Sequence, residues 1–276
     1  MKTKELEEFS KTLRKAILVS LNAAKSGHSG GSLSSIDILN TLYFGGVLNI
    51  DPNNPRNDNQ DRFVLSKGHA APALYVCLAY KGFFDKDLLY TLRKLGSPLQ
   101  GHPDSKKLSG VCASTGSLGH GLSQAVGMAL ALKLKNSPAN VYCLIGDGEM
   151  QEGLVYEALM CASHYKLDNL CVILDFNGLQ IDGAISDVMN ISPVKEKFEA
   201  FGFLTYEVDG HNYDQLLDAF ERFKNTKNSK PFALIAHTIK GKGVSFMENK
   251  YEYHGKPPTD EELNKALLEL GVENGI

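Results

Sequence analysis

Hydrophobic and polar residues alternate in blocks along the chain, and these blocks predict strands and helices in turn. Short apolar runs with the character of buried parallel strands lie at residues 62–65, 141–145, 170–174, 203–208 and 232–236. Apolar residues at helical spacing predict helices at 4–25, 34–44, 70–81, 85–95, 119–134, 150–165 and 213–223. This alternation predicts an α/β fold, a doubly wound and mainly parallel sheet with helices on both faces. We expect one domain over residues 1–276.

A long irregular segment at residues 96–118 interrupts the alternation. It is rich in Gly, Ser and Pro and contains Gly101-His102-Pro103 and, later, the run STGSL at 114–118. A loop of this length inside a compact domain is usually functional or disordered.

Polar residues follow two strands of a central βαβ unit at residues 141–179. Asp147 comes directly after the first strand, between two glycines, and Asn177 follows the second. Parallel strands end at the same edge of a sheet, so the two side chains should converge. A carboxylate and an amide oxygen suit Mg2+, which completes its shell with water and phosphate oxygens. Gly148 would let a phosphate approach the backbone at a helix N-terminus. An Asp147 that merely caps the helix fits the spacing equally well.

Composition and charge narrow the class of protein. The formal net charge of −3 gives no general attraction to nucleic acid or to anionic membranes. The N-terminal residues are too charged for the apolar part of a secretory signal, so we expect none there, and no apolar run approaches membrane-spanning length. The five cysteines are odd in number and contain no CxxC pair, and Cys143 and Cys171 fall within strand patterns. We therefore expect free, buried thiols and a cytoplasmic protein.

Eight histidines stand at residues 28, 69, 102, 120, 164, 211, 237 and 254, and six of them adjoin a glycine. Glycine neighbours place them in turns, where ligands of open α/β sheets bind. Their spacing contains no HxxxH or HxxH pair, so a histidine-ligated zinc is the weaker hypothesis. General acid–base chemistry on hydroxyls and carbonyls suits these imidazoles better.

The run GDGEMQEG at residues 146–153, followed by Asn177, resembles the diphosphate-binding signature of thiamine diphosphate (ThDP) enzymes. The resemblance implies that Asp147 and Asn177 hold Mg2+ (or Ca2+), and that Leu179 adds a backbone carbonyl to the metal. Phe176 is a small departure, since the family often has Asn or Asp at that position.

Further runs are similar to transketolase blocks and occur in transketolase order over nearly the whole chain. They are SGHSGGSLS, SKGHAAPALY, GHPD, STGSLGHGLSQAVGMALA, VDGHN, HTIKGKGVSFMEN and YHGKPP. The resemblance implies that His69 contacts the cofactor diphosphate and that His254 lies near both diphosphate and sugar. It also implies that His28 and His102 face the donor sugar and assist proton transfer.

The same resemblance assigns cofactor contacts to two glycine-containing turns. Gly116 would offer its carbonyl to the aminopyrimidine amino group, Ser117 would line the cofactor, and Leu118 would enforce its bent shape. Gly148 would support the diphosphate. Ser117 stands where many relatives have proline, so the conformation of this loop could differ.

Other positions carry weaker implications. Glu152 and Glu157 match a carboxylate network that links paired active sites in the family, although a solvated helix face explains them equally well. Ser29 replaces a common proline, and His120 a common glutamine. Of the remaining histidines, the one in the DGH run is expected to be a turn residue, and His164 and His237 to be structural.

ThDP chemistry also needs a glutamate against the pyrimidine ring, which the family carries on a second domain. We expect the chain to carry no such domain after the diphosphate-binding blocks. We therefore expect a partner subunit similar to the C-terminal half of transketolase, in a two-fold α2β2 assembly.

The resulting interpretation is the N-terminal subunit of a two-component transketolase, which moves a two-carbon ketol unit from a ketose phosphate to an aldose phosphate. Two alternatives stay open: the α subunit of a 2-oxoacid dehydrogenase or decarboxylase, and a non-catalytic binding subunit. The four histidines at 28, 69, 102 and 254 favour a sugar substrate over a simple oxoacid.

Overall fold

The computed structural model describes residues 1–55 and 57–273, and within these ranges five strands form one parallel sheet. The strands are β1 (Arg62–Leu65), β2 (Val141–Gly146), β3 (Leu170–Phe176), β6 (Leu204–Asp209) and β7 (Phe232–His237). Their order across the sheet is β1-β2-β3-β7-β6, and every neighbouring pair is parallel. All carboxyl ends therefore lie at one edge of the sheet.

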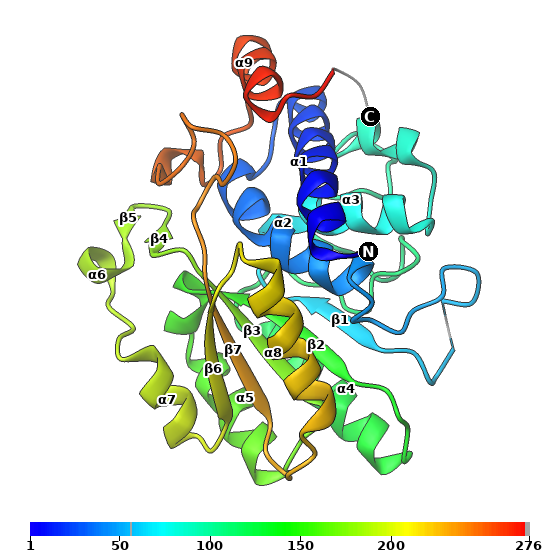
Figure 1. Ribbon diagram of the computed structural model, residues 1–276, viewed down its shortest axis with the longest axis vertical. Helices are drawn as coiled ribbons and strands as arrows, with labels where there is room; N and C mark the ends of the chain where they lie inside the picture. Colours follow the sequence, from blue (N-terminus) through cyan, green and yellow to red (C-terminus); the bar gives the residue numbers. More distant parts are fainter. Residues whose placement is uncertain (56, 274–276) are drawn as a thin grey trace.

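Helices cover both faces of the sheet. The long ones are α1 (Thr3–Ala24), α2 (Ser29–Phe44), α3 (Ala71–Lys81), α4 (His120–Leu134), α5 (Gly153–His164), α8 (Tyr213–Asn225) and α9 (Asp260–Leu270), and α6 (Ile185–Val188) and α7 (Val194–Ala200) are shorter. In Figure 1, α8 lies in front of the sheet and α4 and α5 lie behind it, while α1, α2 and α3 gather at the upper end. The predicted doubly wound architecture is confirmed.

Side-chain alternation along the strands divides the core into two layers. In β2, Tyr142 and Leu144 pack with α1, α2, α3 and α8, whereas Cys143 and Ile145 pack with α4, α5 and α7. A strand that is buried on both faces must be apolar throughout, which is why residues 141–145 form a continuous hydrophobic run. The sheet is thereby fixed from both sides, and its carboxyl edge provides rigid starting points for the loops.

The predicted elements agree with the structure except at a few places. The helix expected at 34–44 begins earlier, at Ser29, so Gly30 and Gly31 lie in its first turn. Gly30 is needed for close packing rather than for a loop, because a Cβ there would lie 2.9 Å from Lys240 and 3.1 Å from a backbone oxygen. The helix expected at 85–95 is wrong; only a 3-10 turn, η2 (Lys86–Thr91), forms.

Several elements were not predicted from the sequence. These are α6, α7, α9, the antiparallel pair β4 (Leu179–Gln180) and β5 (Gly183–Ala184), and the 3-10 turns η1 (Gly68–Ala70), η3 (Gly148–Gln151) and η4 (Tyr251–Tyr253). The irregular segment that was expected at 96–118 is confirmed.

The state of the cysteines and the character of the helices bear on the predicted cellular location. The five cysteines are free, and Cys143 and Cys171 are buried in β2 and β3 as expected. Among the residues that the structure describes, no helix combines the length and apolar character needed to cross a membrane.

Candidate functional site

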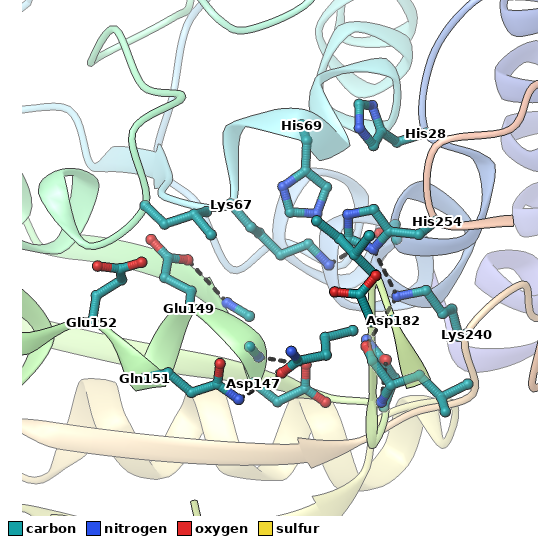
Figure 2. Close-up of a pocket in the computed structure, with 18 of the residues that line it drawn as sticks. His28, Lys67, His69, Asp147, Glu149, Gln151, Glu152, Asp182, Lys240 and His254 are labelled. Carbon is teal, nitrogen blue, oxygen red and sulfur yellow. Dashed lines mark hydrogen bonds between the residues drawn. The ribbon is translucent and has the colours of Figure 1, made fainter. Parts of the chain in front are cut away.

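Loops from four strands enclose a cavity at the carboxyl edge of the sheet. The strand register sets this up, because Gly146 at the end of β2 pairs with Asp175 of β3, and Asp175 pairs with Ala236 of β7. The loops that follow these strands, together with the loop after β1, surround a cavity of about 340 Å3. In Figure 2, the rings of His28, His69 and His254 lie together on one side, and Glu149 and Glu152 lie on the other. Ligands of open α/β sheets bind at such an edge.

Asp147 lies between the turns after β2 and β3. One carboxylate oxygen accepts the Gly148 N–H at 2.8 Å, and the other accepts the Gly178 N–H at 2.6 Å. The side chain caps the short turn η3, so the capping interpretation holds locally, but it also faces the loop that carries Asn177. Burial, and then the nearby charge of Asp175, raise the pKa of Asp147 to about 6. A divalent cation would remove this electrostatic cost, so the residue fits a metal site.

Asn177 and Leu179 line the same cavity as Asp147. The Asn177 side chain accepts the Leu179 N–H at 3.2 Å and lies 3.4 Å from Asp175. The Leu179 carbonyl accepts a hydrogen bond from the Lys240 ammonium at 3.0 Å. The chain thus brings together a carboxylate, an amide and a carbonyl oxygen, the hard oxygen donors that Mg2+ prefers.

Three of the predicted histidines form one cluster of rings. The ring centroids of His28 and His69 are 5.2 Å apart, those of His28 and His254 5.5 Å, and those of His69 and His254 5.0 Å. Burial, and then the charge of Arg93, lower the pKa of His28 to about 4, while burial and Lys240 lower that of His254 to about 3. Burial and Lys67 hold the pKa of His69 well below its usual range. At neutral pH these imidazoles are therefore uncharged, and each has one ring nitrogen that accepts and one that donates a hydrogen bond.

The loop expected to face the cofactor pyrimidine lies beside His102. Gly116 adopts a φ of 150°, and a Cβ at that position would lie 3.0 Å from the His102 ring, so glycine is required there. Gly116 and Leu118 line the cavity, whereas His102 and Ser117 do not and are exposed. Burial, and then Arg93, lower the pKa of His102. The structure therefore places His102 at the rim, behind Gly116.

Glu149 is a buried polar residue of the site that the sequence argument missed. Its carboxylate accepts hydrogen bonds from the Ser66 hydroxyl, from the Gly119 N–H at 2.8 Å and from the Gly146 N–H at 3.1 Å. The side chain is 2% exposed, and burial raises its pKa. Glu149 thus ties together three loops that each carry a predicted site residue.

Two buried lysines also line the cavity and were missed. Lys67 forms an ion pair with Asp175, and both side chains are buried. Lys240 is 2% exposed, and burial and then Lys67 lower its pKa to about 8. Both follow the ends of strands, in the runs SKGH and HTIKG, and a lysine at that position was the one available signal. Because Asp175 balances the charge of Lys67, Lys240 is the lysine that gives this end of the cavity a positive charge suited to a diphosphate.

Of the remaining predicted positions, only some line the cavity. Glu152 lines the cavity, whereas Glu157 is exposed on α5 and does not. Buried Ser29 donates to the Lys256 carbonyl at 2.7 Å, and exposed His120 lies 3.4 Å from the Leu118 carbonyl. In residues 1–55 and 57–273, no three His, Cys, Asp or Glu side chains are grouped so that they could hold a metal ion. The predicted Asp147, Asn177 and Leu179 set contains only one such side chain.

The fold and the cavity are those of an α/β domain with a polar ligand site at the carboxyl edge of its sheet. The family model "Transketolase, thiamine diphosphate binding domain" matches residues 7–275. The chain belongs to the transketolase family and corresponds to this domain, which confirms the resemblance in the sequence and supports ThDP as the cofactor.

The chain matches proteins of about its own length and also part of longer ones. It is 42% identical over 269 residues to 6-deoxy-6-sulfo-D-fructose transketolase subunit SqwG of a Clostridium species, with 98% of this chain and 97% of that protein covered. It is 42% identical to an apulose-4-phosphate transketolase subunit from Phocaeicola vulgatus, with 98% and 95% covered. The structure superimposes on transketolase from Campylobacter jejuni with a TM-score of 0.93 and 37% identity, covering 100% of this chain but 44% of that one.

Proposed function

We propose that the chain is the diphosphate-binding subunit of a two-component transketolase, which moves a two-carbon ketol unit from a ketose phosphate to an aldose phosphate. The observation that carries the proposal is the shared cavity of Asp147, Asn177 and Leu179 with His69 and its neighbouring histidines and lysines. It provides oxygen ligands for one cation beside a positively charged end for a diphosphate.

The residues of this chain hold the two parts of the cofactor. Asp147, Asn177 and the Leu179 carbonyl would hold Mg2+, whose charge would offset that of the buried Asp147 carboxylate. His69, His254 and Gly148 meet the diphosphate, with Lys240 adding a positive charge. Gly116, Ser117 and Leu118 meet the ring portion. When bound, ThDP supplies the electron sink for carbon–carbon bond cleavage, and the protein supplies orientation.

Proton movements at the sugar fall to the histidines. The imidazoles of His28, His102 and His254 would take a proton from a sugar hydroxyl and return it to a carbonyl oxygen. His28 and His254 line the cavity and would act on the donor directly. His102, at the rim beside Gly116, would act on the sugar as it enters.

A partner subunit completes the site in this proposal. The activating glutamate and the pyrimidine pocket would come from a subunit similar to the C-terminal half of transketolase, in an α2β2 complex. Two relatives that the chain matches over nearly their whole length are named as subunits, which supports a split enzyme. The free thiols support a cytoplasmic location.

The sugar substrates are a separate question. One of these relatives is named for a sulfo-sugar and the other for a sugar phosphate. Both sugars end in an anionic group, so a panel of ketoses with terminal phosphate or sulfonate groups is the appropriate set of donors.

The test measures two-carbon transfer with ThDP and Mg2+, using the chain alone, a C-terminal-type partner alone and the two together. We expect activity only in the mixture. Substantial transfer by the chain alone would refute the split site. Release of CO2 from 2-oxoacids without transfer between sugars would favour the 2-oxoacid alternative. A complex whose activity survives Asp147→Ala would favour a non-catalytic subunit.

A further inference from the structure

A buried ionic cluster lies outside the cavity, on the α1 and α2 side of the sheet. The Arg14 guanidinium donates two hydrogen bonds to the Asp37 carboxylate, at 2.9 and 2.6 Å. The His211 ring, in the turn after β6, donates from Nδ1 to the same carboxylate at 2.7 Å, and the Tyr213 hydroxyl donates at 2.7 Å. Arg14 and Asp37 are 5% and 3% exposed. Four elements of the chain therefore meet at one carboxylate.

The same cluster holds the backbone of the segment that follows β7. The Ile239 N–H donates to Nε2 of His211 at 2.8 Å, and Nε of Arg14 donates to the Lys242 carbonyl at 2.9 Å. A backbone N–H can only donate, so Nε2 of His211 is the acceptor and the ring proton is on Nδ1. These two contacts lie on either side of Lys240. Backbone bonds from Gly241 to Gly30 and from Asn249 to Lys240 complete the anchorage.

Lys240 is the residue that this anchorage directs into the cavity. Its ammonium lies 3.0 Å from the Leu179 carbonyl and 3.2 Å from Nδ1 of His254. A buried lysine has little freedom to correct a displaced backbone, because its side chain is surrounded by other atoms. A shift of residues 239–242 would therefore move the ammonium relative to the predicted metal ligand and the diphosphate.

Stability alone gives a weak reason for such a cluster. Replacing a buried ion pair by well-packed apolar residues is often neutral or stabilising. Burial by itself would raise the pKa of Asp37, but the Arg14 guanidinium and the His211 ring hold it below the usual range, so the carboxylate is ionised at neutral pH. A better reason is geometry. The ionised Asp37 carboxylate holds the Arg14 guanidinium and the His211 ring in defined orientations through charge-assisted hydrogen bonds.

We propose that Arg14, Asp37 and His211 form a positioning clamp that fixes residues 239–242 and thereby places the Lys240 ammonium against the cofactor diphosphate. The inference rests on the proposed function, since it assigns a diphosphate to the end of the cavity where Lys240 lies. The clamp residues touch no ligand themselves and act through Lys240.

The test is a double-mutant cycle in the full chain, with binding of ThDP and of inorganic pyrophosphate measured calorimetrically in the presence of Mg2+. We expect His211→Ala and Lys240→Ala each to weaken binding roughly 10-fold or more, the usual effect of losing a supporting contact. If His211 acts through Lys240, His211→Ala adds nothing in the Lys240→Ala background. Fully additive losses, or wild-type affinity in His211→Ala, would overturn the clamp.

Two conservative variants address the possibility that His211→Ala does not fold. Glutamine can place an oxygen near the position of Nε2 and accept the Ile239 N–H, whereas asparagine reaches only the position of Nδ1. His211→Gln should therefore keep more affinity for pyrophosphate than His211→Asn. The reverse order would contradict the clamp.

Asp61→Ala provides the matched control. Asp61 is 5% exposed and accepts N–H groups of Asn49 and Asn140 before β1, away from the carboxyl edge. Its loss should lower the melting temperature and leave pyrophosphate binding unchanged, and an equal loss of binding would show that the effect of His211 is general destabilisation. A wild-type chain that binds neither ThDP nor pyrophosphate, even together with a C-terminal-type partner, would instead refute the proposed function.

Discussion

The Asp147 carboxylate accepts the Gly178 N–H at 2.6 Å, and this contact joins the turn after β2 to the turn after β3. The register of the sheet makes it possible, since Gly146 pairs with Asp175 across the two strands. Through this bond the predicted metal carboxylate and the loop with Asn177 and Leu179 form one unit. Parallel pairing of β2 and β3 therefore fixes the relative position of the two loops that carry the predicted metal ligands.

Asp147→Asn should abolish most of the magnesium-dependent binding of ThDP. The substitution keeps the size of the side chain and removes the only predicted anionic ligand, so we expect a loss of roughly 100-fold or more. Titration of Mg2+ at constant ThDP measures it. Asp187→Asn, at an exposed position of α6, makes the same change of charge outside the cavity and should behave as wild type. Wild-type magnesium affinity in Asp147→Asn would contradict the metal assignment.

The convergence of Asp147 and Asn177 could be predicted because it depends on backbone topology alone. Two apolar runs joined by one helix pattern define parallel neighbours, and parallel neighbours end together. The same reasoning gave the strands around them, which the structure confirms nearly to the residue. The roles that the family resemblance assigned to individual site residues stay predictions.

The missed residues depend on tertiary packing, which a single sequence does not show. A lysine after a strand is usually solvated, and nothing local indicates that Lys67 and Lys240 are buried. Glu149 sits in a turn where an exposed acid is ordinary, yet three loops close over it. The run of glycines before residue 34 indicated a loop, but Gly30 and Gly31 allow close packing of a helix end.

Glu149→Gln should destabilise the chain and disturb the loop before α4. The amide has only one oxygen, so its NH2 group would face the N–H of either Gly119 or Gly146. That buried donor would lose its acceptor, at a cost of about 1–3 kcal/mol. Urea unfolding monitored by circular dichroism measures it. Glu152→Gln, an exposed neighbour that lines the same cavity, should stay within about 0.5 kcal/mol of wild type. Equal urea midpoints for Glu149→Gln and wild type would contradict the role of Glu149.

The histidine cluster should make the ligand-free chain less stable in mild acid. The pKa values of His28 and His254 are lowered to about 4 and about 3 in the folded chain, against an ordinary value of 6.5. Between those values the unfolded chain binds more protons, so the free energy of unfolding rises with pH. The stability is therefore fully present above pH 6.5 and is lost as the pH falls, down to about 4 for His28 and about 3 for His254.

Urea unfolding at several pH values checks this expectation. The double variant His28→Asn and His254→Asn should show a shallower dependence of stability on pH between about 4 and 6.5. The variant His164→Asn changes an exposed histidine at the end of α5 and should keep the wild-type slope. A wild-type slope in the double variant would show that other groups control the acid sensitivity.

Lys67→Met should be among the most destabilising substitutions near the cavity. Lys67 and Asp175 form an ion pair in which the side chains are 2% and 0% exposed, and Asp175 also accepts the Ser34 hydroxyl at 2.6 Å. Removing the ammonium leaves a buried carboxylate without its cation, which costs about 3–5 kcal/mol. Unfolding in urea measures the loss, and Asp175→Asn in the same background should recover part of it because the charge is removed. Lys133→Met breaks a pair with Asp168 in which the lysine is 39% exposed, and should cost less than about 1 kcal/mol. If the two lysine variants lost similar stability, burial of the Lys67 pair would not be the reason for its strength.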